Sequence, residues 1–268
     1  MAQDKKTGER LPFKLSFVIP AYNEEACLAG CLASIIGRIE QAGADAEVIV
    51  VNNGSTDSTR RIALSFPGVI VVDEPVKGLS RARQAGYRAA SGDLIANIDA
   101  DNMLPEGWLE KVLAEFSENE RLVALSGPLA YYDLSRARRA CTTMFYCVGY
   151  TIYLLSHYVL RRGGMLQGGN FVLRRSALEA IGGYDTEIAF YGEDTDVARR
   201  MQPAGRIKFT FRLPMYSSGR RFAKEGIAAT GFRYALNYLW IMVFKRPYSR
   251  SSTDVRPGSD GQSGLPVC

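Results

Sequence analysis

Two carboxylates stand two residues apart directly after a short apolar segment. Asp99 and Asp101 flank Ala100 and follow the segment 94–98, LIANI. An apolar run of this length predicts a buried strand, and side chains just beyond its end can point into one crevice. Mg²⁺ and Mn²⁺ prefer oxygen ligands, usually one or two carboxylates together with substrate phosphates. The pair is therefore a candidate metal site, although solvated loops also contain Asp-x-Asp.

A second acidic pair, Glu193-Asp194, follows a loop rich in glycine and tyrosine at 182–192. Acids at the start of a helix are favoured by the helix dipole alone. The functional alternative is a general base that takes the proton from an attacking hydroxyl. His157 is the only histidine, which argues against a Ser-His-Asp triad and against histidine metal sites. The chemistry thus falls to carboxylates, amides and basic groups.

Short polar groups and basic side chains complete the candidate chemistry. The segment 52–57, NNGSTD, follows another apolar run, and its side chains could read a base or a ribose or form a plain turn. Guanidinium and ammonium groups could hold a diphosphate or be solvated surface charges. The basic residues considered for this role are Lys77, Arg81, Arg83, Arg220 and Arg221.

The elements that must position these residues alternate between apolar strands and amphipathic helices. The expected strands are 15–20, 47–51, 69–72, 94–98 and 122–126. Asn23 and Ser80 are expected to cap helices, and Pro105 to lie in the first turn of another. This alternation predicts a mostly parallel sheet covered by helices on both faces, with ligands beyond the carboxyl ends of the strands.

The second half of the chain is less regular. Its expected elements are helices at 137–160, 193–202 and 225–244 and strands at 170–173 and 206–211. We divide the chain into a polar tail (1–12), a catalytic domain (13–215), a C-terminal helical segment (216–247) and a tail (248–268). The last tail is rich in Ser, Gly and Pro and is expected to be disordered.

Composition narrows the class of protein. The 268 residues carry 33 Lys and Arg against 28 Asp and Glu, a net charge of +5, with no long basic run that would indicate nucleic acid. Residues 1–14 lack the apolar core of a signal peptide, so we expect a cytoplasmic protein, with the inner face of the membrane as an alternative. No segment reaches the ~20 uninterrupted apolar residues that span a bilayer.

Several motifs, taken in order, resemble family 2 glycosyltransferases, inverting enzymes with a nucleotide-sugar-binding fold. The match begins with FVIPAYNEE and EVIVVNNGSTDST and covers about residues 13–215. The later motifs are KGLSRARQAG from Lys77, Asp99-Ala100-Asp101, Gly168-Gly169-Asn170, Gly182-Gly183-Tyr184-Asp185 and Glu193-Asp194-Thr195-Asp196. One such motif would be weak evidence, whereas the ordered set is specific.

The resemblance implies an α/β protein with a single GT-A type domain. Its sheet would be Rossmann-like, mostly parallel and covered by helices on both faces, and a C-terminal helical appendage would follow. Asp101, with Asp99, would bind Mn²⁺ or Mg²⁺, and Asp194, with Glu193 beside it, would be the catalytic base. The expected acceptor side comprises Gly168, Gly169, Asn170 and Glu193. The expected donor site comprises Pro20, Ala21, Tyr22, Glu24, Asn53, Asp57, Lys77, Arg83, Asp99, Ala100, Arg220 and Arg221.

The chain departs from the family pattern at specific places. Asn53 stands where the family more often has Asp, and Gln84 follows Arg83 where the family has Asn. An amide both donates and accepts, whereas a carboxylate only accepts, so a UDP-sugar is favoured while a GDP-sugar stays open. The chain lacks the Gln-x-x-Arg-Trp motif and the flanking membrane helices of processive synthases, which indicates addition of one sugar.

The acceptor is left open between a saccharide, a lipid-linked molecule and a small molecule, in cell-surface glycan or glycolipid synthesis. The segments 141–162 and 227–246 are apolar and aromatic and end in basic residues. They could be core helices, a homodimer face or a peripheral membrane contact. Among specific transferases, a polyprenyl-phosphate sugar synthase is an alternative.

Other classes of protein remain as rivals. A sugar nucleotidyltransferase would show a glycine-rich loop with Arg and Lys after the first strand, and a dehydrogenase would show Gly-x-Gly-x-x-Gly there. The chain has Pro-Ala-Tyr-Asn-Glu-Glu instead. A non-catalytic nucleotide-sugar-binding protein would more readily lose Asp101 or Asp194, and both are present.

Overall fold

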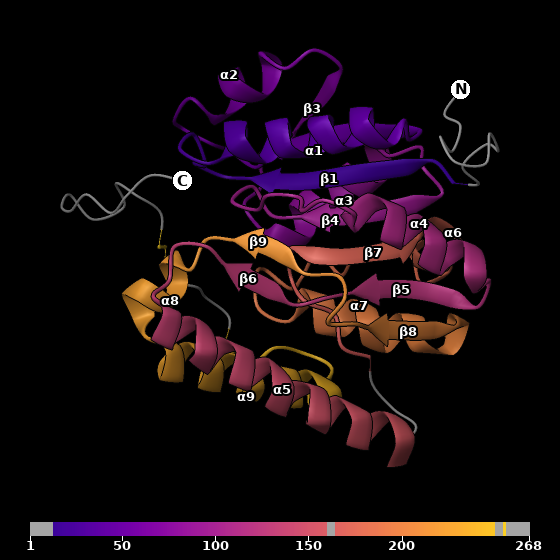
Figure 1. Ribbon diagram of the computed structural model, residues 1–268, viewed down its shortest axis with the longest axis vertical. Helices are drawn as coiled ribbons and strands as arrows, with labels where there is room; N and C mark the ends of the chain where they lie inside the picture. The colour runs from indigo at the N-terminus through magenta and orange to yellow at the C-terminus, as the bar shows by residue number, and fades with distance from the viewer. Residues whose placement is uncertain (1–12, 160–163, 250–253, 256–268) are drawn as a thin grey trace.

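The computed structural model describes residues 13–159, 164–249, 254 and 255. Its centre is a seven-stranded sheet in the order β3-β2-β1-β4-β7-β5-β8 (Figure 1). The strands are β1 Leu15–Ala21, β2 Ala46–Asn52, β3 Val69–Asp73, β4 Leu94–Ile98, β5 Leu122–Ser126, β7 Asn170–Arg174 and β8 Arg206–Phe209. All run parallel except β7, which pairs antiparallel with both β4 and β5.

Helices cover both faces of the sheet, as the alternating sequence pattern predicts. One apolar core packs α1 (Leu28–Ala42), α2 (Thr59–Leu64) and α4 (Trp108–Glu118) against one face. The other face is covered by α3 (Leu79–Ala89), α6 (Arg175–Ala180) and α7 (Glu193–Met201), through two further apolar clusters. Strands buried on both sides are continuous hydrophobic runs for this reason. The predicted fold class, a mostly parallel α/β sheet with helices on both faces, is confirmed.

Some local predictions are corrected by the structure. Asn23 does not cap α1, which begins at Leu28. Asn23 has a left-handed backbone with φ of 51°, and its side-chain oxygen accepts the Thr56 N–H at 2.8 Å. It therefore ties the β1–α1 loop to the loop after β2. Similarly, Pro105 lies before α4, which begins at Trp108 after a left-handed Gly107.

Smaller elements were missed because they are too short to carry a periodic pattern. A two-stranded parallel sheet joins β6 (Leu129–Tyr131) to β9 (Met215–Ser217). The antiparallel direction of β7 also has no signature in its own residues. It follows from the connection through α5 (Arg136–Val159), which the sequence does not orient.

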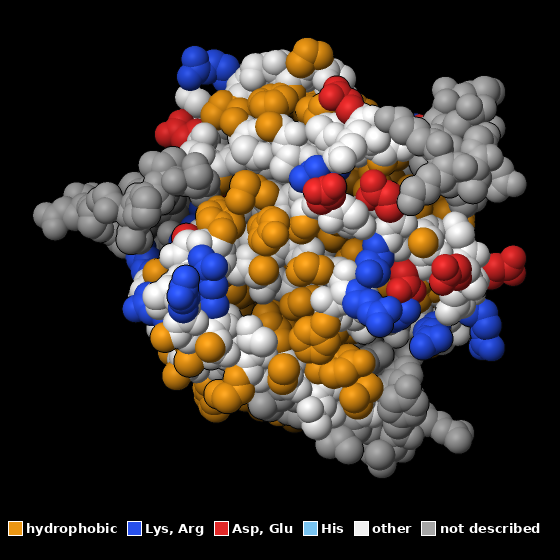
Figure 2. Space-filling model, in the orientation of Figure 1, with side chains coloured by type: hydrophobic (Ala, Val, Ile, Leu, Met, Phe, Trp, Pro, Cys, Tyr) orange, Lys and Arg blue, Asp and Glu red, His pale blue; other side chains and the backbone are white. Residues whose placement is uncertain are grey.

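Three helices lie outside the sheet in Figure 1: α5 and α9 (Ile227–Phe244) run below it, and α8 (Arg220–Glu225) lies to its left. A 3-10 turn, Gln202–Ala204, leads from α7 to β8. Figure 2 shows hydrophobic side chains gathered over α5 and α9. Among the described residues, no helix is long and apolar enough to cross a membrane. The tail predicted at 1–12 lies outside the described residues, as do 250–253 and 256–268 of the tail predicted at 248–268.

Candidate active site

A cavity of about 800 Å³ opens at the carboxyl ends of β1, β2 and β4. Strand order reverses between β1 and β4, and the crevice at such a point is where open α/β sheets bind ligands. The opposite wall comes from α5, α8 and α9. A volume of this size is in the range of pockets that enclose most of a ligand's surface.

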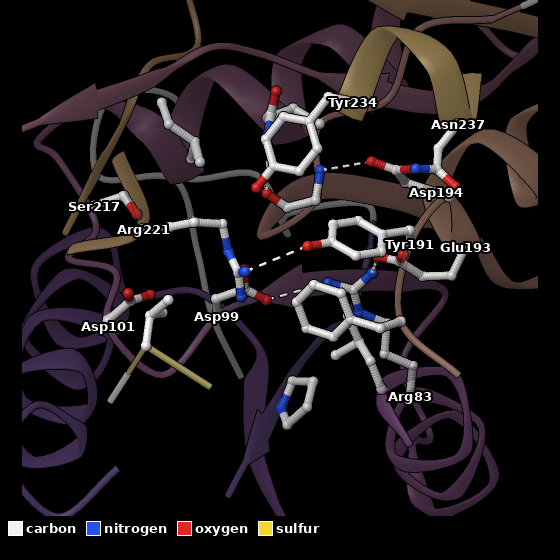
Figure 3. Close-up of a pocket in the computed structure, with 18 of the residues that line it drawn as sticks. Arg83, Asp99, Asp101, Tyr191, Glu193, Asp194, Ser217, Arg221, Tyr234 and Asn237 are labelled. Atoms are coloured by element: carbon white, nitrogen blue, oxygen red, sulfur yellow. Dashed lines mark hydrogen bonds and ion pairs between the residues drawn. The ribbon is translucent and has the colours of Figure 1, made fainter. Parts of the chain in front are cut away.

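Most of the residues expected from the sequence line this one cavity (Figure 3). Those that do are Pro20, Ala21, Tyr22, Glu24, Asn53, Lys77, Arg83, Asp99, Ala100, Asp101, Gly168, Glu193, Asp194, Arg220 and Arg221. Segments far apart in the chain therefore meet at the sheet edge, as the strand-end rule predicts.

Among the basic candidates, Arg81 lies outside the cavity and contacts Glu187 at 3.6 Å, and three residues of the expected donor and acceptor sites do not line it either. Asp57 organises a turn: its carboxylate accepts the N–H of Thr59 at 2.9 Å and of Glu25 at 3.2 Å. Asn170 is fully buried, and its amide donates to the Leu213 carbonyl at 2.8 Å. Gly169 has φ of +78° and packs directly against Asp99 from behind. All three support the site from outside.

Arg83 connects the two acidic pairs. It lies on α3, is fully buried, and contacts Asp99 at 3.1 Å and Glu193 through a short ion pair. Its guanidinium also lies 4.8 Å from the centre of the Phe171 ring. Burial alone would lower the pKa of Arg83, but Glu193 and Asp99 raise it, so the side chain stays charged. One buried cation thus fixes the metal-site acid and the base-site acid relative to each other.

A second ion-pair group surrounds Arg220 at the start of α8. Its two terminal nitrogens donate to the carboxylate of Glu24 at 2.9 and 2.6 Å, and Nη2 also lies 3.2 Å from Asp101. Burial raises the pKa of Asp101 to about 7; Arg220 opposes this rise, whereas Glu24 and Asp99 add to it. Further negative charge at the donor-side acids is therefore disfavoured even with Arg220 beside them.

Of the two acids at the start of α7, Glu193 is buried and Asp194 is half-buried. Burial raises the pKa of Glu193 to about 8 against the opposing effect of Arg83. Burial also raises the pKa of Asp194, opposed by Arg83 and by N–H groups that bond its carboxylate. Gly168 N–H donates to Asp194 Oδ2 at 2.9 Å, and Thr195 N–H to Oδ1 at 2.6 Å. A raised pKa and a fixed direction suit a proton acceptor.

Asn53 uses its amide to shape the loop after β3. Its nitrogen donates to the carbonyls of Glu74 at 2.9 Å and Val76 at 2.8 Å, and its oxygen accepts the Gly78 N–H at 2.9 Å. Both amide hydrogens are thereby used within the protein. A carboxylate could not make the two donated bonds.

Lys77, at the end of that loop, reaches across to Tyr22. Its ammonium group bonds the Tyr22 hydroxyl and lies 4.1 Å from the ring centre. The pair forms the side of the cavity that faces β1 and β2. The Tyr22 ring can stack on a base, and the Lys77 ammonium group can bind a phosphate.

Asp99 and Asp101 fit a divalent cation by their chemistry. Both offer carboxylate oxygens to the cavity, and the Asp99 side chain is 38 % exposed. Within the described part of the chain, no group of three or more His, Cys, Asp or Glu residues could hold a metal ion by itself. A bound ion would therefore complete its shell with water or ligand phosphate oxygens, as Mg²⁺ sites commonly do.

The wall formed by α5 and α9 was not predicted as part of the site. Tyr234 and Asn237 of α9 line the cavity beside Asp194 (Figure 3), as does Phe145 of α5, and Tyr191 and Met165 extend the lining from loops. Their only sequence signal was an apolar and aromatic pattern, which equally fits core helices. The segment therefore indicated burial but not the cavity.

The chain is similar to known glycosyltransferases in sequence. The sequence profile described as "Glycosyl transferase family 2" matches residues 16–182, more than half of the chain. A probable glycosyltransferase of Bacillus subtilis, YdaM, is 28% identical over 222 residues, covering 76% of this chain and 50% of that protein. Glycosyltransferase GlyA of Streptococcus pneumoniae is 29% identical over 128 residues, covering 46% and 18%. This chain thus spans half or less of these relatives' length.

Solved structures agree on the fold. A mannosyltransferase from Pyrobaculum calidifontis, in complex with GDP-Man and Mn²⁺, has a TM-score of 0.62 at 21% identity, covering 91% of this chain and 66% of that one. A glucosyl-3-phosphoglycerate synthase from Mycobacterium tuberculosis, with Mn²⁺ and UDP-glucose, has a TM-score of 0.59 at 20% identity, covering 85% and 78%. The predicted GT-A fold is confirmed by these likenesses. The matched profile shows that the chain belongs to glycosyl transferase family 2.

Proposed function

We propose that the protein is a metal-dependent, inverting glycosyltransferase that moves one sugar from a nucleotide-sugar donor to an acceptor hydroxyl. The observation that carries the proposal is the single cavity in which Arg83 joins Asp99 to Glu193. Donor-side and acceptor-side acids are held together there at the ligand-binding edge of the sheet. The nucleotide-sugar complexes of two structurally similar proteins support this class of donor.

The donor diphosphate belongs at Asp99 and Asp101. These carboxylates would hold Mn²⁺ or Mg²⁺, which when bound neutralises the charge that develops on the leaving diphosphate. Arg220, fixed against Glu24 and Asp101, lies where it can add to that stabilisation. Asn53 and Tyr22 line the side expected to face the nucleoside. A UDP-sugar is favoured, with a GDP-sugar as the alternative.

Asp194 is the better general base of the acidic pair. Glu193 is already engaged by Arg83, whereas no described residue forms an ion pair with Asp194. Two N–H bonds orient its carboxylate, and burial raises its pKa. It would take the proton of the acceptor hydroxyl while that oxygen attacks the anomeric carbon opposite the leaving group. The configuration would invert without a covalent enzyme intermediate.

Donor binding is tested first by thermal shift with UDP and GDP, each with and without Mn²⁺. A ligand at about 100 times its Kd adds ~2.7 kcal/mol, which for a domain of this size is a shift of roughly 5–10 °C. We expect such a shift with one nucleotide, dependent on metal and lost in Asp101→Asn. Asp45→Asn, at an exposed residue before β2, is the matched control and should keep it. No shift with either nucleotide would contradict the proposed donor class.

Catalysis is tested separately with Asp194→Asn. The substitution removes the base but keeps the shape, so turnover of the donor that binds should be lost while nucleotide binding stays near wild type. Loss of nucleotide binding in this variant would contradict the role of base. A wild-type protein that binds nucleotide and metal but turns over no sugar with any acceptor class would instead favour a non-catalytic nucleotide-sugar-binding protein.

A further inference from the structure

Helix α9 exposes an apolar stripe to solvent. Phe232 is 71% exposed and Val243 is 68% exposed. Spacings of three and four residues place the stripe on one side of the helix. Its exposed members are Ala228, Phe232, Ala235, Leu239 and Val243. A continuous exposed apolar surface on a folded protein marks an interaction site.

The same helix turns its polar groups inward. Thr230 and Asn237 are buried, and Arg233, the only charged residue between 227 and 244, donates to Tyr191 at 3.2 Å and to Glu225 at 3.1 Å. A surface helix of a protein that meets only water has the opposite arrangement. The exposed side of α9 is therefore built for an apolar environment.

Basic residues flank this surface, and acidic residues are absent from its helices. Exposed Lys245 and Arg246 follow α9, and α5, which packs beside it at Gly231, begins with exposed Arg136 and Arg138. Neither α5 nor α9 contains an Asp or Glu. Figure 2 shows basic side chains beside the hydrophobic surface over these helices. Apolar side chains bordered by Lys and Arg match a bilayer with anionic headgroups.

The stripe reaches the rim of the cavity. Ala235 and Leu239 are exposed members of the stripe and also line the cavity. We propose that the exposed stripe of α9 docks on an anionic membrane surface and holds the rim of the cavity against the bilayer. The acceptor hydroxyl would then be carried by a lipid, a conclusion that rests on the proposed function. A second copy of the chain fits this surface less well, because the basic residues beside the two stripes would repel each other.

Docking is tested by vesicle flotation with phosphatidylcholine alone and with added phosphatidylglycerol. The full chain should float with anionic vesicles and weakly with neutral ones, since each basic residue near the surface contributes about fivefold. Phe232→Glu/Val243→Glu should lower the partition coefficient by at least about tenfold, because two charges replace apolar groups at the contact. Leu64→Glu/Ile70→Glu adds the same charge at side chains 56% and 41% exposed on α2 and β3, and should bind like wild type.

Trp240 reports which face meets the lipid. It lies on α9 beside the stripe, whereas the other tryptophan, Trp108, is 2% exposed in the core. Brominated lipid in anionic vesicles should quench the fluorescence of Trp240. Flotation without quenching, or equal flotation of the two double variants, would overturn the proposal. So would a stable dimer that only Phe232→Glu/Val243→Glu dissociates, because the stripe would then be a subunit interface.

Nucleotide binding separates this proposal from the proposed function. Phe232 and Val243 do not line the cavity, so their double variant should keep the thermal shift with nucleotide and Mn²⁺. Wild-type protein that floats and is quenched but binds no nucleotide would support docking and contradict the donor site. Protein that binds nucleotide and ignores vesicles would keep the donor site and overturn docking.

Discussion

Gly169 should be essential to the position of Asp99. A Cβ added at Gly169 would lie 2.5 Å from Asp99 Oδ2, whereas ordinary contact begins at 3.4 Å, so the carboxylate would have to retreat by about 0.9 Å (3.4 − 2.5). The other oxygen of that carboxylate contacts Arg83 at 3.1 Å. Gly169→Ala therefore adds backbone strain, since its φ is +78°, and also displaces a carboxylate of the donor site.

Gly68 offers a control, because it has the same left-handed backbone conformation but no atom close to an added Cβ. Its φ is +79°, and a Cβ there would meet nothing within 4 Å. Left-handed strain of roughly 1–2 kcal/mol should lower the Tm of both alanine variants by about 2–8 °C. Only Gly169→Ala should also weaken binding of nucleotide with Mn²⁺, by about 10–100-fold, the worth of one charged hydrogen bond. Equal nucleotide affinity of the two variants in calorimetric titration would refute this account of Asp99.

Three further outcomes follow from contacts near the cavity and the sheet. Asn53→Asp should lower stability by about 1–3 kcal/mol in urea unfolding, because a carboxylate would face two loop carbonyls that the amide now bonds; unchanged stability would contradict that bonding. Arg220→Lys should lower Tm, since an ammonium cannot make both bonds to Glu24; an unchanged Tm would show that these two bonds do not stabilise the protein. Burial alone would raise the pKa of Glu47, but hydrogen bonds from Ser16 and Ser91 outweigh burial and lower this pKa to about 2. The stability that Glu47 adds is therefore present above pH 4.5 and lost on acidification toward pH 2, by up to about 3 kcal/mol; Glu47→Gln should flatten this part of the stability–pH curve, and an unchanged slope would exclude the assignment.

The sheet and the donor side of the cavity could be predicted because the end of a buried strand is recognisable in the sequence. An apolar run followed by polar residues marks both an element and its functional edge, which is how Asp99 and Asp101 were found. Direction and pairing across the sheet are non-local, so the antiparallel β7 was not predicted. Asn53 illustrates the limit at one residue: its place in the cavity was predicted, but not its bonds to the loop carbonyls of Glu74 and Val76.

The α5–α9 wall could not be predicted for a different physical reason. An apolar pattern tells that a helix avoids water, but not which of its sides meets protein, ligand or lipid. In α9, Asn237 is buried and Arg233 is half-buried, whereas Phe232 and Leu239 are exposed. Hydrophobicity alone would assign the sides the other way round. Only the tertiary contacts of Arg233 with Glu225 and Tyr191 reveal which side faces inward.

The charges of the cavity predict that donor and metal bind together. Two buried guanidinium groups, Arg83 and Arg220, are surrounded by five carboxylates. These are Glu24, Asp99, Asp101, Glu193 and Asp194. The raised pKa values of Asp101 and Glu193 show that the site resists further negative charge, and a diphosphate entering alone would add such charge at low local dielectric. A divalent cation at Asp99 and Asp101 reverses that balance on the donor side.

Nucleoside diphosphate affinity should therefore rise by at least about tenfold when Mn²⁺ is added, and Mn²⁺ affinity should rise by the same factor with nucleotide, since the coupling is reciprocal. Calorimetric titration in both orders measures the two factors. A control nucleoside without phosphates should show no such coupling, because it brings no negative charge. Equal nucleotide affinity with and without Mn²⁺ would mean that Arg83 and Arg220, with Lys77, suffice for the diphosphate, and that the carboxylates of Asp99 and Asp101 serve another purpose.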